Sequence, residues 1–554
     1  MKKIQVIILT LATLVSMASC DKDNHKTVRT FRATAERSKD DGKISLSGGS
    51  LLWSAGDSIR IYDGGGNCAN YLLLSGAGEV EGVFDYSSGD EIAESPYKAV
   101  YPARFFSGSS QITLPNVQRT ADGSLREPPM YAVSDDEELS FYNVCGVVRF
   151  RLTARSSVNL RSIALTTDVA TNGTATLSGS GTSTTIGTPD GTTTTILLCE
   201  TAQSIASAHD FYMYLPAGSY TGLSIRLMAD DKSSCTKSTS GTINVQRGKI
   251  CTITLTNLNF TNPGTLPGEF SVAADRTVRF SMGNLQYQAS TSTWHLAEHQ
   301  WDYVGSQNPS YGSRGGTVAG SDNIYISSSY SGWIDLFGWG TSGYHDAADS
   351  YNIYYQPWST SMDTVDVTYN CYGYGPSTNM TDLNLTGTSA NYDWGVYNAI
   401  SNGGNAAGLW RTMTDREWEY LINTRSASTV NGTANARYTK AMVNDINGAI
   451  FFPDSYAHPT DVAQPVNINT QSGHHTDNMY TTNDWMAMEA CGAVFLPAAG
   501  RRNGTRFLGA RGSYWTASMS TNYFARSLNF DDANMNIPTN NKRYDGRSVR
   551  LVKD

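Results

Sequence analysis

The chain of 554 residues is poor in charge and in long apolar runs. Only 16% of its residues are charged, and its formal net charge is −9. A negative protein has no general attraction to phosphates, so nucleic acid is not expected as a partner. Beyond residue 15 no apolar run is long enough to cross a bilayer as a helix.

Cysteine is scarce and irregularly spaced. Apart from Cys20, the cysteines are Cys68, Cys145, Cys199, Cys235, Cys251, Cys371 and Cys491. An odd, scattered set is not a disulfide framework, and strand-like flanks predict buried free thiols. No Ser/His/Asp arrangement or phosphate-binding glycine loop is present, so the sequence predicts no catalytic residue, no cofactor and no metal.

Two weak metal-site patterns have packing or structural hydrogen bonding as their alternative. His295 and His299 have the i, i+4 spacing of helical zinc ligands, but Trp294 and Trp301 beside them favour packing. Asp335 and Asp393 are candidates for a calcium site, but their aromatic neighbours favour structural hydrogen bonding. The pair at 474–475 is expected to be solvated.

The N-terminus has the pattern of a secretion signal. Lys2 and Lys3 precede an apolar stretch from Ile4 to Val15, which is too short to span a bilayer. The following residues, 16–20, resemble a bacterial lipoprotein box that ends in Cys20. This resemblance implies a signal peptide over 1–19, lipidation of Cys20, a tether over 20–28 and attachment to the membrane through lipid.

Residues 29–260 predict an all-β region. Short alternating runs separated by turns, such as Ser58–Tyr62 and Ile250–Leu255, predict a β-sandwich with lobes of about 29–154 and 155–260. A Pro/Gly linker over 261–268 marks the boundary with a module over 269–554. The expected fold class is mainly β, with an α+β C-terminal domain.

Several motifs in residues 28–260 resemble the fimbrillin family of Bacteroidetes surface pilins. They lie at 52–59, 101–103, 114–118, 129–130 and 139–150. The resemblance implies an outer-membrane lipoprotein at the cell surface or in a fimbrium, proteolytic loss of the first strand, and other fimbrillin subunits as partners by strand addition. Arg37 follows the strand-like segment Thr30–Glu36 and is the candidate cleavage residue; the alternative is an ordinary exposed arginine.

One helix is predicted in the C-terminal module. Thr414 and Glu417 form a capping-box pattern, after which Trp418, Leu421 and Ile422 share one apolar face. This stretch, residues 514–518 and residues 548–552 resemble the C-type-lectin-like fold of Bacteroidetes surface proteins, which is related to formylglycine-generating enzymes. An enzyme of that kind is the least favoured interpretation, because the only cysteines of the module are Cys371 and Cys491.

The last forty residues carry the predicted binding site. Three strand-like runs, 512–518, 524–530 and 545–552, alternate with polar residues suited to recognition. The candidate ligand-binding residues are Ser513, Tyr514, Ser520, Thr521, Asn522, Tyr523, Arg526, Asn529, Asp531, Asp532, Asn534, Asn536, Asn540, Asn541 and Tyr544. From Arg501 to Asp554 the net charge is +6, which could attract an anionic glycan or surface, or form a solvated face. Ordinary turn chemistry is the alternative for the polar residues.

The C-type-lectin-like resemblance also implies diversification. In proteins altered by diversity-generating retroelements, Asn codons of a C-terminal stretch are randomised, and most of the candidate positions look like such products. Trp515, Leu528, Phe530, Val549 and Leu551 would be the fixed positions between them.

The sequence therefore predicts a cell-surface adhesin, and in particular a pilus tip subunit that binds an unidentified protein or glycan. The alternatives are a structural pilin and a surface lipoprotein that does not polymerise.

Overall fold

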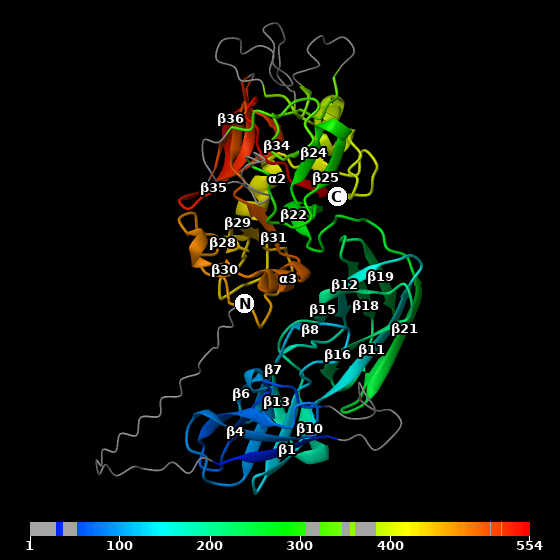
Figure 1. Ribbon diagram of the computed structural model, residues 1–554, viewed down its shortest axis with the longest axis vertical. Helices are drawn as coiled ribbons and strands as arrows, with labels where there is room; N and C mark the ends of the chain where they lie inside the picture. Colours follow the sequence, from blue (N-terminus) through cyan, green and yellow to red (C-terminus); the bar gives the residue numbers. More distant parts are fainter. Residues whose placement is uncertain are drawn as a thin grey trace, which may run out of the picture.

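A computed structural model describes residues 29–36, 52–305, 322–345, 355–360, 384–509, 511–521 and 523–554. The protein is mainly β, as predicted. Figure 1 shows a small N-terminal barrel, a second β lobe and a C-terminal module following one another along the long axis.

The first part is a closed barrel rather than the predicted half of a sandwich. Its strands are β1 (Phe31–Ala35), β2 (Ser58–Tyr62), β3 (Cys68–Ser75), β4 (Glu81–Gly89), β5 (Tyr97–Tyr101), β9 (Met130–Ser134) and β10 (Glu138–Asn143). They close in the order β1-β10-β9-β5-β2-β3-β4. The alternation of β1 directs Phe31, Ala33 and Ala35 into the barrel core and leaves Arg32 exposed.

The second lobe contains strands from both predicted halves. They are β8 (Val117–Thr120), β11 (Cys145–Ala154), β12 (Asn159–Thr166), β15 (Thr194–Ser204), β16 (His209–Pro216), β17 (Gly218–Tyr220), β18 (Leu223–Ala229), β19 (Ser234–Thr239), β20 (Ile243–Val245) and β21 (Ile250–Leu258). A separate sheet of order β14-β13-β7-β6 lies next to the barrel and shares an apolar cluster with Val100 and Tyr131 of the barrel (Figure 1); its strands are β6 (Phe106–Gly108), β7 (Gln111–Leu114), β13 (Gly173–Ser178) and β14 (Thr185–Ile186). The main sheets of the second lobe have the orders β16-β11-β21 and β19-β18-β12-β15-β8. The predicted division near Ala154 is displaced, because β11 pairs with β16 and β21 and so belongs to this lobe.

Several small sheets build the C-terminal module. Its strands are β22 (Phe270–Ala273), β23 (Arg276–Phe280), β24 (Leu285–Gln288), β25 (Thr293–Leu296), β26 (Trp333–Ile334), β27 (Arg411–Thr412), β28 (Tyr438–Val443), β29 (Ile446–Phe451), β30 (Met479–Tyr480), β31 (Val494–Pro497), β32 (Arg501–Asn503), β33 (Arg506–Leu508), β34 (Gly512–Met519), β35 (Phe524–Asp531), β36 (Asn534–Lys542) and β37 (Leu551–Lys553). Their common core contains the buried indoles of Trp339, Trp394, Trp410, Trp418 and Trp515.

The helices are short. They are η1 (Ala103–Phe105), η2 (Gly181–Ser183), η3 (Ala289–Thr291), η5 (Gly387–Tyr392), α1 (Trp394–Tyr397), α2 (Asp415–Glu419), the π-helical turn η6 (Tyr420–Thr424), η7 (His475–Asp477) and α3 (Thr482–Ala490). The predicted helix is confirmed as α2 and η6: Glu417 N donates to Thr414 Oγ1 at 3.2 Å, and Thr414 N donates to Glu417 Oε2 at 2.7 Å. Helix α3 was missed, although Thr481 and Asp484 form the same capping box.

The segment predicted as a linker is packed against both neighbours. Thr261 and Ser234 exchange backbone hydrogen bonds of 2.9 and 2.8 Å, and Leu266 is fully buried. Ile196 and Leu198 of the second lobe share one apolar cluster with Trp485 of the module. The module is therefore docked on the second lobe through a continuous core.

Two sequence-level expectations concern cysteines and membrane helices. Cys145, Cys199 and Cys235 are buried free thiols, and the described residues contain no disulfide. Within the described ranges, no helix combines the length and the apolar character needed to span a bilayer. Cys20, Arg37 and Cys371 lie outside the described residues.

Candidate ligand-binding surface

The predicted binding residues lie around one three-stranded antiparallel sheet of order β34-β35-β36. The backbone register pairs Ser513 with Asn529, and Asn529 in turn with Asn536. Gly512 permits the closest approach in this sheet, because a Cβ there would lie 2.0 Å from the ring of Phe530. Strand β36 has no second partner among the described strands and is the edge of the sheet.

Buried side chains form the base of this sheet. Tyr514 stacks on Phe530 with ring centroids 6.1 Å apart, and both belong to the module core. The guanidinium of Arg547 lies 5.2 Å from the centroid of Trp515. Arg547 donates to Ser513 Oγ, to Asn541 Oδ1 at 2.6 Å and to Asp545 Oδ2 at 3.1 Å. Arg547 therefore connects the two outer strands, β34 and β36, on the buried side of the sheet.

The exposure of the candidate residues separates them into three groups. The exposed ones are Thr521, Tyr523, Asp532, Asn534, Asn536 and Asn540. The half-buried ones are Ser520, Arg526, Asn529, Asp531, Asn541 and Tyr544, and Ser513 and Tyr514 are fully buried. Asn522 lies outside the described residues.

The prediction is wrong for Ser513 and Tyr514 as ligand contacts. Ser513 is covered by Arg547 and donates to Asn529 Oδ1 at 2.6 Å. The hydroxyl of Tyr514 donates to the carbonyl of Pro497 at 2.7 Å. Both side chains support the sheet from inside instead of facing a partner.

The third strand of the sheet also differs from the prediction. Residues 534–542 form β36, whereas the predicted run 545–552 makes isolated bridges at 546–548 and becomes a strand at Leu551–Lys553. Asn and Pro disfavour strands, so β36 gave no strand pattern in the sequence. Residues 534, 536 and 540 therefore lie on a fixed strand and not on a loop.

The candidate residues gather at the two ends of the sheet. Thr521, Tyr523 and Tyr544 lie at one end, where Arg543 donates to the carbonyl of Thr521 at 2.7 Å. Residues 531–536 lie at the other end, around the β35–β36 turn. Strand β35 has eight residues, so the two ends are separated by roughly 25 Å.

Internal pairing occupies part of the polar surface. At the β35–β36 turn, Asp532 accepts hydrogen bonds from His475 N at 3.0 Å and from His475 Nδ1 at 2.5 Å. Asp531 accepts from Asn534 Nδ2 at 3.2 Å, whereas no hydrogen bond to a described residue involves the side chain of Asn536. His475 was predicted to be solvated but is buried, because it closes the underside of this turn.

Sequence reasoning missed the arginines below the sheet. Arg543 lies 4.7 Å above the ring centroid of Trp339 and is buried, as are Arg547 and Arg550. The net charge of +6 between Arg501 and Asp554 was the feature of the sequence that could have indicated them. The charge of these three side chains lies in the interior and not on a solvated face.

The residues of the weak metal-site patterns are held by contacts within the protein. His295 stacks on Trp333 and His299 on Trp301, with ring centroids 3.6 and 4.7 Å apart. Burial raises the pKa of Asp393 to about 6, although its carboxylate accepts from Thr412 N at 2.8 Å. Within the described part of the chain, no group of three His, Cys, Asp or Glu side chains could hold a metal.

A second surface of interest is the site of β1 in the barrel. Strand β1 runs parallel to β10 and antiparallel to β4, and it closes the barrel between them. Just beyond it, Glu36 accepts hydrogen bonds from Asn143 N at 2.8 Å and from Arg247 Nη1 at 3.1 Å. The groove between β4 and β10, which β1 occupies, thus binds apolar side chains at alternate positions of the strand. The carboxylate of Glu36 is bound just beyond its end.

Comparisons with known proteins give only distant structural similarity. No protein-family model matches the chain, and no curated protein matches it. A candidate cell adhesion protein from Bacteroides ovatus is 12% identical with a TM-score of 0.29, over 42% of this chain and 95% of its own. A fimbrial protein from the same species is 11% identical with a TM-score of 0.20, over 94% and 97%. The tip fimbrial protein Mfa3 from Porphyromonas gingivalis is 9% identical with a TM-score of 0.22, over 42% and 99%. TM-scores below 0.5 carry no conclusion about this chain.

Proposed function

We propose that this protein is a cell-surface adhesin whose ligand binds along the edge strand β36. One observation carries the proposal: Asn534, Asn536 and Asn540 point outward from β36, while the strands beneath them rest on a buried aromatic and arginine base. A rigid sheet loses little entropy on binding, and amide side chains can donate and accept hydrogen bonds.

Aromatic and cationic side chains extend this surface. Tyr523 is 50% exposed at the end of the sheet and adds aromatic surface to this face. Arg526 donates to Asn540 at 2.7 Å, which holds the amide in place beside a positive charge. A glycan or a polar protein surface is the class of ligand that suits such a patch.

We also propose that the protein occupies the tip of a fimbrium. A shaft subunit must donate a strand to its neighbour. Here the last strand, β37, pairs with β23 and β27 inside its own module, and Leu551 and Val552 are fully buried. Donation of β37 would break the module core, so this strand is poorly suited to complete a neighbouring subunit, which supports the tip position.

The acceptor role is assigned to the barrel groove. Under this proposal Cys20 carries the lipid that brings the protein to the outer membrane, and a cut at Arg37 releases β1. A strand of another fimbrial subunit then replaces it by β-strand addition. The flanking strands β4 and β10 would each offer the incoming strand a row of backbone partners.

Diversification of the binding surface belongs to the same proposal, together with the C-type-lectin-like assignment of the module. Trp515, Leu528, Phe530, Val549 and Leu551 are buried, which suits positions that cannot vary. A near-copy template repeat and a reverse transcriptase gene beside the coding sequence are the expected genomic features. Their absence would remove this part of the proposal and leave adhesion untouched.

The purified protein should be tested on glycan and protein arrays, with a variant carrying Asn536→Ala and Asn540→Ala as the comparison. Binding that is retained by the variant would contradict the placement of the site. Immunogold labelling of isolated fibres separates the rivals: label at fibre ends supports a tip subunit, label along the shaft a structural pilin, and label only on cells a lipoprotein that does not polymerise.

A further inference from the structure

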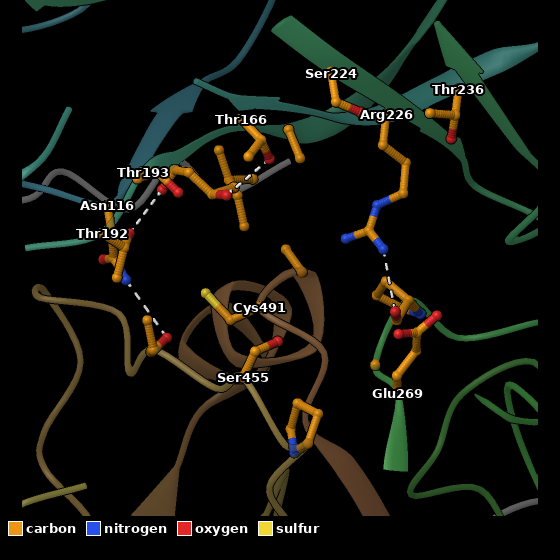
Figure 2. Close-up of a pocket in the computed structure, with 18 of the residues that line it drawn as sticks. Asn116, Thr166, Thr192, Thr193, Ser224, Arg226, Thr236, Glu269, Ser455 and Cys491 are labelled. Carbon is orange, nitrogen blue, oxygen red and sulfur yellow. Dashed lines mark hydrogen bonds between the residues drawn. The ribbon is translucent and has the colours of Figure 1, made fainter. Parts of the chain in front are cut away.

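A cleft of about 680 Å³ lies between the second lobe and the C-terminal module, and its lining residues are distinct from those of the sheet β34–β36. Figure 2 shows its lining, with Thr166, Ser224 and Arg226 on the side of the second lobe and Glu269 and Ser455 on the side of the module. Ligand clefts for small molecules commonly have volumes of about 300–1,000 Å³ and occur between domains.

The walls of this cleft are held in place by contacts around it. Arg119 of the second lobe pairs with Asp461 of the module at 2.7 Å. Lys232 and Glu489 form a second ion pair across the same boundary, with both side chains largely buried. The shared apolar cluster lies alongside. The cleft is therefore a feature of one rigid assembly, and a ligand would find it already formed.

The functional centre of the cleft is Arg226 on β18. Figure 2 shows its side chain reaching from the strand into the cleft, where Nη1 donates to the carbonyl of Pro267 at 3.1 Å. No carboxylate of the described residues forms an ion pair with it. Burial and, to a smaller extent, the charge of Arg279 lower the pKa of Arg226 to about 10, whereas the charge of Glu269 opposes this shift. The guanidinium is still cationic at neutral pH, so it places a positive charge at the cleft that no described carboxylate contacts directly.

The neighbouring charges do not neutralise Arg226. Glu269 is the acidic residue of the cleft lining, but its carboxylate pairs with Arg279 at 2.5 Å. Burial raises the pKa of the Cys491 thiol to about 12, so this sulfur is neutral and does not repel an anion. The remaining N–H groups of Arg226 suit a planar carboxylate, which can accept two parallel hydrogen bonds.

Hydroxyl groups dominate the rest of the lining. Thr166 Oγ1 and Thr194 Oγ1 lie 2.8 Å apart on adjacent strands, and Ser224 accepts from Ser238 at 3.3 Å. Thr236 is exposed beside Arg226. Such groups can both donate and accept, as the hydroxyls of a sugar ring require.

We propose that this cleft binds a carboxylate-bearing saccharide of one or two rings, with its carboxylate on Arg226 and its ring hydroxyls on the Thr and Ser side chains. The site is separate from the β36 surface and does not depend on the proposed adhesin function. A hexuronate and a sialate both carry this chemistry.

The test is calorimetric titration of the purified protein with glucuronate, N-acetylneuraminate, glucuronate methyl ester, glucose and acetate. At least one of the two acidic sugars should bind at least about tenfold more tightly than the ester, glucose and acetate, since a charged hydrogen bond and several neutral ones are lost in these probes. Equal binding of acid and ester, or no binding of either acidic sugar, would overturn the proposal.

Arg226→Gln should weaken binding of the acidic sugar by at least about tenfold and abolish the preference for acid over ester. Arg149→Gln is the matched control, because Arg149 lies in the same lobe and makes a single side-chain hydrogen bond, to Thr252 at 3.2 Å. Unchanged binding in Arg226→Gln would contradict the assignment. If this variant does not fold, the acid and ester titrations of the unaltered protein decide the matter. A short acidic peptide is titrated as a further probe, and tighter binding of this peptide than of either sugar would contradict a saccharide ligand.

Discussion

The imidazole of His295 lies flat on the indole of Trp333, with the ring centroids 3.6 Å apart and an interplanar angle of 9°. Its Nε2 is 2.6 Å from Gln286 Oε1, and burial lowers the pKa of His295 from 6.5 to about 4. His295 and His299, which have the i, i+4 spacing in the sequence, therefore lie in two separate aromatic stacks.

This burial predicts a pH dependence of stability. Because the folded pKa lies below the unfolded one, the unfolded chain takes up a proton between pH 6.5 and 4 that the folded chain does not. The His295 contribution should fall as the pH decreases through this window, by about 2 kcal/mol at pH 5. Urea unfolding of the protein and of His295→Gln across pH 7 to 4.5 should show a flatter profile in the variant. A profile unchanged from that of the exposed-site control His474→Gln would refute this assignment.

Arg547 should be the most sensitive charged residue below the binding sheet. Arg547→Met leaves Ser513, Asn541 and Asp545 without their buried donor, and we expect a loss of about 3 kcal/mol in the free energy of unfolding. Arg506→Met, at an exposed position, should change it by less than about 0.5 kcal/mol. Similar values for the two variants in denaturant unfolding would show that Arg547 does not hold the strands together.

The surface of β36 should affect binding without affecting the fold. The triple variant Tyr523→Ser, Asn536→Ala and Asn540→Ala should reduce adherence of protein-coated beads to target cells by about tenfold, with an unchanged melting temperature. Tyr397→Ser with Asn483→Ala is the control, since both positions are exposed elsewhere in the module. An equal loss in the control would indicate a nonspecific surface effect.

The barrel groove should accept its own first strand in trans. A chain that begins at Arg37 lacks β1 and should melt at a lower temperature, and a peptide of residues 29–36 should restore the loss. The same peptide with Phe31→Asp should fail, because it places a charge in the apolar core. A peptide with Arg32→Ser should still work, since Arg32 is exposed. If the truncated chain has an unchanged melting temperature and no peptide alters it, strand addition at this groove is excluded.

Local patterns in the sequence were sufficient to predict the elements that depend on interactions between residues close in sequence. The alternation in Phe31–Ala35 and the capping box at Thr414 and Glu417 depend on neighbours within a few residues, and both appear as predicted. The buried positions Trp515 and Leu528 were also predictable, because large apolar side chains in short strands have few other places to lie.

Tertiary structure alone decided which polar residues face outward. Ser513 and Asn536 are both small polar residues on strands of one sheet, yet Ser513 is buried against Arg547 and Asn536 is exposed on the edge strand. The cleft around Arg226 likewise depends on the docking of two parts that are distant in sequence. Composition and periodicity report the preferences of single segments, whereas exposure and unpaired charge are fixed only when segments pack against one another.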